Sequence, residues 1–481
     1  MSAGHLATAL SSLEPLLPVP PPSSTLYSDR SDYAALSSVL AVFAGLAKSC
    51  PDISYTAPPA GAGPLAKLEK KLHSKFRELL ATLSARLLSG KRYAVKLLLS
   101  LLRSTPYSAD AGAALLLSAL AVPAGAEPRF LQVALEALAA HADLRYFLYS
   151  RAAKVLAGEG GALRPEVAVR LLKEVGGGMG GAPAKGFEFY GLPEGTDLEE
   201  EPESSEEPRT KKQKATERAK AVRKSAHAFA LQSLFLALLS PSLSLANPRP
   251  VLSLLPAHLS SFPNPLYFSG PLLELHSSGN TLTSILTLTS LFTLITKHSL
   301  ACPPYYPRLH SLITPATFNS PHLGKFLPLL TLSLKTTHMP TYMYRAFAKR
   351  LLRTALAASP SSALFLAKYA SNLLRDPRCA PLVHRNDGGD FEDEYDWTAG
   401  SLDGANANAT MAWEIHALRK HYYAPVADVA HKIGKEKGEV LYDLGDVGRE
   451  GVADLFARES GKERGGELGV AFDEVGDELW Y

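Results

Sequence analysis

Cysteine is scarce in this 481-residue chain, and its three copies lie far apart. Cys50, Cys302 and Cys379 form no C-x-x-C pair, so nothing in their spacing supports a disulfide framework or a zinc site. Scattered thiols of this kind fit a reducing compartment. We therefore expect no metal ion and no fold that depends on disulfides.

The motifs that usually mark catalysis or cofactor binding are also missing. No Walker A loop, G-x-S-x-G elbow or H-E-x-x-H pair occurs in the sequence. Gly176, Gly178 and Gly181 match G-x-G-x-x-G, but they follow a helical pattern where a dinucleotide-binding loop needs a strand. We expect no catalytic residues, no cofactor and no small-molecule substrate.

No apolar run is long enough to suggest a membrane protein. The most apolar stretch, Thr281–Thr296, is shorter than the ~20 residues that a bilayer needs and is rich in Thr and Ser. The N-terminal residues lack the basic region of a secretory signal and run into prolines. The stretch reads better as a buried helix, and we expect no membrane partner.

Net charge of one sign is lacking as well, because the formal net charge is only +3. This balance argues against a uniformly basic nucleic-acid-binding protein, so local patches must carry any such role. Two patches stand out: the basic run Arg209–Lys224, which follows the acidic run Asp197–Pro208, and a basic helix face between Thr341 and Ala358.

What the chain does have is leucine and alanine at helical spacing. Within Leu65–Leu88, for example, apolar residues recur every three or four positions, while the opposite face carries lysines. Short blocks of this kind follow one another, separated by Pro and Gly. None could bury its apolar face alone, so we predict an all-α fold, an α-solenoid of HEAT/armadillo-like helical pairs with a disordered charged linker. No repeat of fixed length is visible, which leaves an irregular helical array as the alternative.

The domain boundaries follow from changes in composition and charge. We predict an irregular Pro/Ser-rich lead-in (1–29), an N-terminal helical solenoid (30–175), a flexible acidic/basic linker (176–220), a C-terminal helical domain (221–434) with an acidic loop (386–409), and a Gly/charge-rich tail (435–481).

The basic helix Thr341–Ala358 separates its residues by type. Its apolar residues and its cations occupy opposite arcs of about 140° each. The cations are predicted to point outward together; they are Arg345, Lys349, Arg350 and Arg353. Such a face is either merely solvated or contacts phosphates or an acidic protein partner.

Several separated blocks, in the same order, resemble the C-terminal domain of the CCAAT-binding-factor family of nucleolar proteins, and within it the nucleolar complex protein four branch. The central block, THMPTYMYRAFAKRLLRTAL, is similar nearly residue for residue. The blocks are Ser290–Leu300, Pro304–Pro315, Thr337–Leu356, Asn372–Arg385 and Trp413–Ala430. The sequence departs from the family after the acidic insertion, at Asp396-Trp397 and the residues that follow.

The resemblance implies a non-enzymatic assembly factor of the nucleus and nucleolus. It would act in the small-subunit processome and in 18S ribosomal RNA maturation, as a heterodimer with another large nucleolar protein, on the pre-ribosomal particle and its pre-rRNA. The structural family residues are Phe347, Leu351, Asn372, Trp413, His421 and Tyr422, of which we expect Trp413 and Tyr422 to be packed in the core. The alternative is a nuclear DNA-binding or transcription-related protein, although no zinc finger, helix-turn-helix or basic zipper pattern appears.

The basic run predicts a nuclear-import signal, centred on Lys211, Lys212, Lys214, Arg223 and Lys224. Replacing Lys211, Lys212 and Lys214 by alanine should leave a fluorescently tagged protein partly in the cytoplasm, because import receptors read clustered positive charge. An unchanged distribution by microscopy would mean that import depends on another segment or on a partner.

Overall fold

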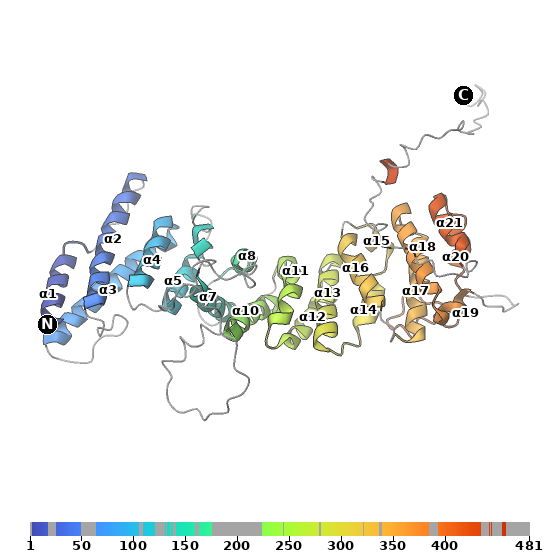
Figure 1. Ribbon diagram of the computed structural model, residues 1–481, viewed down its shortest axis with the longest axis horizontal. Helices are drawn as coiled ribbons and strands as arrows, with labels where there is room; N and C mark the ends of the chain where they lie inside the picture. The colour runs from blue at the N-terminus through green and yellow to red at the C-terminus, as the bar shows by residue number, and fades with distance from the viewer. Residues whose placement is uncertain are drawn as a thin grey trace, which may run out of the picture. The chain divides into compact units, whose positions relative to one another are not determined.

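The computed structural model places every described residue with secondary structure in a helix, and none of them in a β-strand. The predicted all-α class is confirmed (Figure 1). The residues that the structure describes are 2–17, 26–49, 64–104, 109–120, 130, 132–134, 136–137, 141–158, 163–175, 224–243, 245–278, 280–320, 322–335, 339–383, 393–433, 442, 444 and 455–457.

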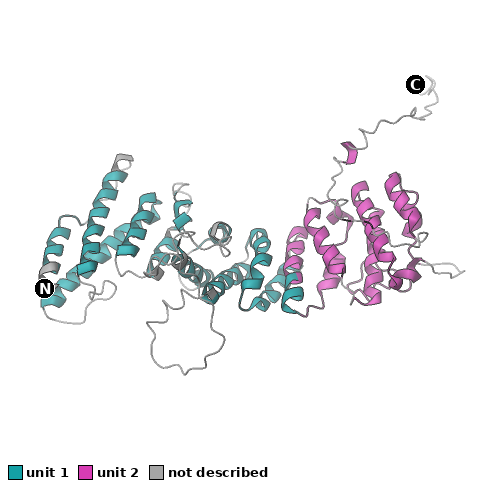
Figure 2. Ribbon diagram, viewed as in Figure 1, with its two compact units in different colours: residues 1–279, 293–300 teal, residues 280–292, 301–481 magenta. Residues whose placement is uncertain are grey.

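The chain divides into two compact units, which Figure 2 colours separately. Unit 1 comprises residues 1–279 and 293–300, and unit 2 comprises 280–292 and 301–481, so the division falls within one helix, α13 (Thr281–His298). The other helices of unit 1 are α1 (Ser2–Leu13), α2 (Leu26–Ser49), α3 (Pro64–Leu88), α4 (Arg92–Ser104), α5 (Ala109–Leu120), α7 (Ala142–Leu156), α8 (Pro165–Val175), α10 (Lys224–Leu239), α11 (Arg249–His258) and α12 (Ser269–Ser278).

Unit 2 is built around two long helices that pack against each other, α17 (Thr341–Ala355) and α18 (Pro360–Leu374). Its shorter helices are α14 (Tyr305–Ser311), α15 (Pro315–Phe318), α16 (Leu323–Leu334), α19 (Ala380–Val383), α20 (Glu414–Leu418) and α21 (Ala424–Lys432). Short 3₁₀ turns link several helices, at Pro241–Leu243, Leu259–Ser261, Pro265–Phe268 and Pro377–Cys379.

Helices pack mainly against partners close to them in sequence. In unit 1, α1 contacts α2 and α3, α3 contacts α4 and α5, α5 contacts α7, and α7 contacts α10. In unit 2, α18 also contacts α21, and α17 contacts α20. This stepwise packing, in which each helix buries its apolar face against its neighbours, is the solenoid-like arrangement that the sequence predicts.

The first helices of unit 1 are joined by both apolar and polar contacts. Phe43 of α2 and Phe76 of α3 meet edge to face, with their ring centroids 5.2 Å apart. About three turns further along the same two helices, Arg86 of α3 donates to both carboxylate oxygens of Asp32 in α2, at 2.8 and 3.1 Å. Tyr93 of α4 donates its hydroxyl to the same carboxylate. A buried aspartate thus holds three helices together.

The structure corrects the predicted N-terminal lead-in, because residues 2–13 form α1. Leu6, Leu10 and Leu13 are buried at helical spacing. The prolines at 18–22 suggested an irregular segment, but they follow the helix and do not interrupt it.

The two compact units also differ from the domains predicted from charge: α10, assigned by sequence to the C-terminal domain, packs against α7 within unit 1. The linker 176–220 lies outside the described residues, as does nearly all of the tail.

The most apolar stretch forms α13, in which buried hydroxyls bond to the helix's own carbonyls. Thr287 Oγ1 donates to Ser284 O at 2.8 Å, and Ser290 Oγ donates to Leu286 O at 3.2 Å. These bonds satisfy polar groups that would otherwise be costly to bury. Among the described residues, no helix is both long enough and apolar enough to cross a membrane.

Candidate functional site

The four cations of α17 do not form an outward face. The side chain of Lys349 is 0% exposed, and Arg350 is 5% exposed. Arg345 and Arg353 are half-buried. The prediction that these residues point outward together is wrong. The reason is that the chain folds back over this side of α17 when it returns at residues 393–414, so the helix is covered on both faces.

Lys349 is the centre of this covered face. Its Nζ lies 3.1 Å from Asp393 Oδ2 and 3.1 Å from Glu414 Oε2, and it donates to Met411 O at 2.6 Å. The ammonium group therefore has three oxygen partners, the number of protons it can donate. Two of the three carry negative charge, which compensates for the loss of water around a fully buried cation.

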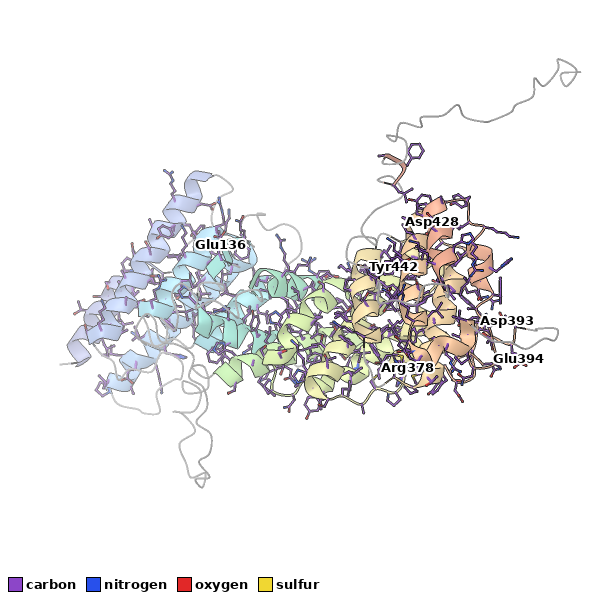
Figure 3. The ribbon with its side chains drawn as sticks, turned by 45° about the vertical axis from the view of Figure 1, so that its right-hand side comes forward. Glu136, Arg378, Asp393, Glu394, Asp428 and Tyr442 are labelled. Atoms are coloured by element: carbon purple, nitrogen blue, oxygen red, sulfur yellow. The ribbon has the colours of Figure 1, made fainter. Side chains whose placement is uncertain are left out.

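The two carboxylates that face Lys349 differ in their surroundings. Asp393 also accepts from Trp413 Nε1 at 2.6 Å and lies 3.5 Å from Arg353 Nη1 (Figure 3 labels Asp393). Burial opposes ionisation of Asp393, but the bonds from Trp413 and Lys349 outweigh it and lower the pKa of Asp393. Glu414 is fully buried, and burial raises its pKa in spite of Lys349. The cluster balances two cations with two anions.

Arg350 fastens a different part of the chain to α17. Its guanidinium donates to three carbonyls, Ile313 O at 3.0 Å, Trp397 O at 2.7 Å and Ser311 O at 3.4 Å. The same group lies 4.1 Å from the centroid of the Trp397 ring, in cation–π geometry. A planar guanidinium can donate to several carbonyls and stack on an aromatic ring at the same time, which the ammonium group of lysine cannot do.

His310, on α14, completes the buried cluster. Its Nε2 lies 3.3 Å from the hydroxyl of Tyr395, and its ring meets Phe347 edge to face, 5.3 Å between centroids. Burial, together with the positive charge of Arg350, lowers the pKa of His310 to about 3. The imidazole is therefore neutral at physiological pH.

Arg345 is the first of the four cations along α17, and it also binds groups of its own chain. Its Nε donates to Arg378 O at 2.6 Å, and its Nη1 donates to Asn408 Oδ1 at 3.0 Å. Arg378 in turn stacks on the Tyr344 ring at 4.1 Å and binds Asp376 at 2.7 Å. Each of the four α17 cations thus contacts groups of its own chain.

Three of the residues implied by the family resemblance are structural in different ways. Phe347 and Leu351 are fully buried on the apolar side of α17. Asn372 of α18 forms two hydrogen bonds with the backbone of Tyr442: its Nδ2 donates to Tyr442 O and its Oδ1 accepts from Tyr442 N, both at 2.9 Å (Figure 3 labels Tyr442). The ring of Tyr442 lies 5.8 Å from Lys368 Nζ.

The remaining family residues are not in the core. Trp413 is 38% exposed, because it lies over the α17 cations with its indole N–H directed at Asp393. Tyr422 is 79% exposed and stacks on His421, with ring centroids 4.4 Å apart. The prediction that Trp413 and Tyr422 are packed inside is wrong. Helical periodicity could not reveal this, since Trp413 precedes α20 and Tyr422 lies in the connection between α20 and α21.

Comparison with known proteins decides what this cluster belongs to. Residues 284–430 match the family model described as CBF/Mak21 family, and they contain α17 with both of its carboxylate partners. Over these residues the chain is similar to the CBF/Mak21 family. The resemblance read from the sequence is thereby confirmed.

Relatives of this CBF/Mak21 domain bear nucleolar names. The human "Nucleolar complex protein 4 homolog" is 40% identical over 156 residues, which is 32% of this chain and 30% of that protein. "Nucleolar complex protein 4 homolog B" of Xenopus laevis is 34% identical over 182 residues, 37% of this chain and 35% of that protein. The chain thus matches about a third of the length of these relatives.

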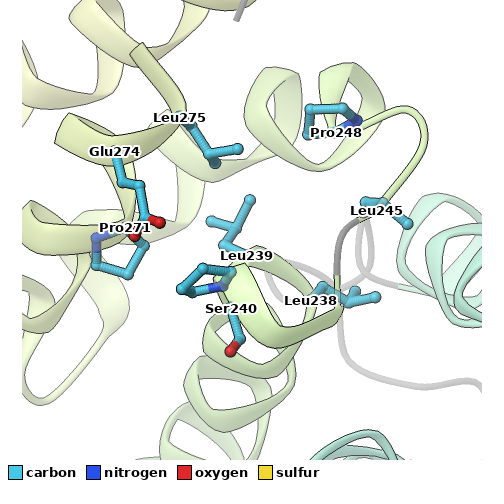
Figure 4. A pocket seen from close by; sticks show the side chains of 9 residues that line it. Leu238, Leu239, Ser240, Leu245, Pro248, Pro271, Glu274 and Leu275 are labelled. Carbon is cyan, nitrogen blue, oxygen red and sulfur yellow. The ribbon is translucent and has the colours of Figure 1, made fainter. Parts of the chain in front are cut away.

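Outside the CBF/Mak21 domain, one open cavity of about 210 Å³ lies in unit 1. It is lined by Leu238, Leu239, Ser240, Pro241, Leu245, Pro248, Pro271, Glu274 and Leu275 (Figure 4). Its lining is largely apolar, with one carboxylate and one hydroxyl. Within the described ranges, no group of three or more His, Cys, Asp or Glu side chains could hold a metal ion.

The predicted import residues Lys211, Lys212, Lys214 and Arg223 lie outside the described residues, and Lys224 is the first residue of α10. The sequence reasoning missed Asp393, Glu414, Trp397 and Tyr395 as partners of the α17 cations. One signal was available for them. An acidic segment follows a basic helix in a chain whose total charge is nearly zero.

The buried ion cluster gives a testable stability difference. Lys349→Met should lower the free energy of unfolding by about 3–5 kcal/mol, because it leaves the carboxyl group of Glu414 buried without its cation. The double variant Lys349→Met/Glu414→Leu should recover most of this loss, since a buried pair can often be replaced by apolar groups. Urea denaturation followed by circular dichroism measures both.

Lys420→Met, at an exposed lysine of the same domain, is the matched control and should change stability by less than about 0.5 kcal/mol. If Lys349→Met costs no more than this control, Lys349 does not hold the domain together.

His310 predicts a pH dependence of stability. The pKa of His310 is about 3 in the folded protein, below the ordinary value of 6.5. Between these two pH values the imidazole binds a proton in the unfolded chain but not in the folded protein. Stability should therefore fall as pH drops from 6.5, by up to about 1.4 kcal/mol per pH unit from this group. His310→Gln should make that decline shallower in denaturation curves between pH 7 and 4. His416→Gln, at an exposed position, is the control, and equal slopes for His310→Gln and wild type would contradict the assignment.

Proposed function

We propose that this protein is a non-enzymatic nucleolar scaffold in ribosome biogenesis, acting in assembly and maturation of the small-subunit (18S rRNA) processome. The observation that carries the proposal is the CBF/Mak21 match, together with relatives named as nucleolar complex protein 4 homologs. The site itself supports a scaffold. Its charged groups bind other groups of the same chain, so ion pairs and hydrogen bonds stabilise the helical domain.

A scaffold of this kind acts by holding partners at its surface. We propose that it forms a heterodimer with another large nucleolar protein and works on the pre-ribosomal particle. Exposed aromatic residues are the usual anchors of such contacts. Tyr422 fits this role, because it is exposed and its ring is already held in place by stacking on His421.

The proposal is tested by sedimentation of a tagged protein from nuclear extract. Co-migration with particles that contain precursors of 18S rRNA, and loss of mature 18S rRNA after depletion, are the expected results. Migration only with large-subunit precursors, or only as free protein, would contradict it. A gel-shift affinity for one defined DNA duplex far above that for random DNA would instead support a DNA-binding protein.

The partner surface is tested by Tyr422→Ala. This variant should capture markedly less of the partner nucleolar protein in pull-downs while unfolding within about 0.5 kcal/mol of wild type, because an exposed ring contributes little to folding. Tyr267→Ala is the matched control, since Tyr267 is 66% exposed but lies in unit 1. Equal capture by the two variants would remove Tyr422 from the partner surface.

A further inference from the structure

Helix α3 carries an exposed basic stripe that the site described above does not use. Its exposed cations fall within an arc of about 120° at 100° per residue. They are Lys67, Lys70, Lys71 and Arg77, with Ser74 between them, and all five residues are exposed. The opposite side of the helix is apolar and buried, with Leu72, Phe76, Leu79 and Leu83 in the core. The stripe therefore faces solvent over about three turns.

The part of the chain that contains this helix has an excess of positive charge. Residues 1–104 hold twelve Lys and Arg against six Asp and Glu, which gives them a net charge of +6, whereas the full chain has +3. The remainder of the chain is therefore net negative. A local excess of this size attracts polyanions even in a protein that is nearly neutral overall.

Ion pairs within this part of the chain engage several of its acids with cations other than those of the stripe. Asp32 binds the buried Arg86 at 2.8 Å, Asp29 binds Lys91 at 3.0 Å, and Glu78 binds Lys75 at 3.1 Å. Half of the six acids are thus engaged with cations outside the stripe. The neighbouring helix α4 adds three exposed cations within about 40° of one another, at Arg92, Lys96 and Arg103.

The composition of the stripe favours a nucleic-acid backbone over a protein as its ligand. Protein interfaces are built around aromatic and apolar anchors and are depleted in lysine. The stripe has three lysines, one arginine and one serine, and no aromatic residue. Lys, Arg and Ser are the side chains that contact phosphate oxygens, and these contacts carry no sequence information.

We propose that α3 binds the phosphodiester backbone of RNA through Lys67, Lys70, Lys71 and Arg77, without sequence preference. This assignment deepens the proposed function and rests on it for the choice of RNA. The proposed RNA contact thus lies on α3 and not on α17, because the α17 cations bind carboxylates and carbonyls of the chain itself. The stripe lies outside the CBF/Mak21 domain, which begins at residue 284.

The test compares two triple variants of the full-length protein. In Lys67→Gln/Lys71→Gln/Arg77→Gln the stripe loses three charges, and glutamine keeps the helix propensity. In Lys325→Gln/Lys420→Gln/Lys432→Gln three exposed lysines of unit 2 are lost, so the net charge changes equally. Binding of a fluorescent single-stranded RNA of mixed sequence is measured by anisotropy across a range of salt concentrations, with melting curves to check folding.

The stripe variant should bind RNA at least tenfold more weakly at 0.1 M salt than wild type. The slope of log K against log salt should shrink by about 2, which corresponds to three lost contacts at about 0.7 each. The unit 2 variant should keep the wild-type slope. Equal slopes in wild type and stripe variant, or equal losses in both variants, would overturn the proposal. Displacement of RNA by poly-glutamate at matched charge would assign the stripe to an acidic protein instead.

Failure of this inference and failure of the proposed function are distinguishable. Wild-type co-sedimentation with pre-ribosomes alongside unchanged RNA binding by the stripe variant removes only the α3 assignment. Conversely, RNA binding lost in the stripe variant, with no co-sedimentation of wild type, removes the ribosome-assembly role and leaves the RNA-binding surface in place.

Discussion

A lysine ammonium with no exposed surface must be neutralised where it lies, and Lys349 imposes that requirement on unit 2. Its partners come from the acidic loop (386–409) and from the residues that follow it, 44 to 65 residues further along the chain. The returning chain is consequently held along α17 at Asp393, Met411 and Glu414. The buried charge of Lys349 thus attaches a non-helical segment to a helix, which packing of helices alone would not do.

The neighbouring cation Arg350 holds the part of the insertion where the sequence analysis expects a departure from the family. Trp397, which lies at this expected departure, stacks on Arg350, and its carbonyl accepts a hydrogen bond from the same guanidinium. Asp396 accepts from the backbone N–H and the hydroxyl of Thr398, which forms a local turn. Because Arg350 binds carbonyls, which every residue has, its partners need not keep a particular side chain.

The elements of the fold could be predicted from the sequence, but the surroundings of the site could not. Periodicity predicted a helix over Leu65–Leu88 and the structure has α3 at Pro64–Leu88, because apolar spacing is a local property. It also correctly separated the cations of α17 from the apolar face. It could not say what covers those cations, since that depends on residues such as Glu414, whose proximity to Lys349 is a property of the tertiary fold. Trp413 and Tyr422 were misjudged for a related reason: large aromatic residues are usually buried, but one of these is held by a polar bond at the surface and the other is left exposed.

Helices α3 and α17 carry similar basic stripes, but the stripe of α3 is exposed and that of α17 is covered by the chain. Both are amphipathic, both place cations opposite leucine and phenylalanine, and in sequence the two patterns look alike. The difference lies in the carboxylates. In unit 2 a returning segment supplies Asp393 and Glu414 to the helix face, whereas Asp29, Asp32 and Glu78 of unit 1 bind Lys91, Arg86 and Lys75, which lie outside the stripe. A nearly neutral chain can thus present a strongly basic surface, because the pairing of its charges is decided by the fold and not by their total.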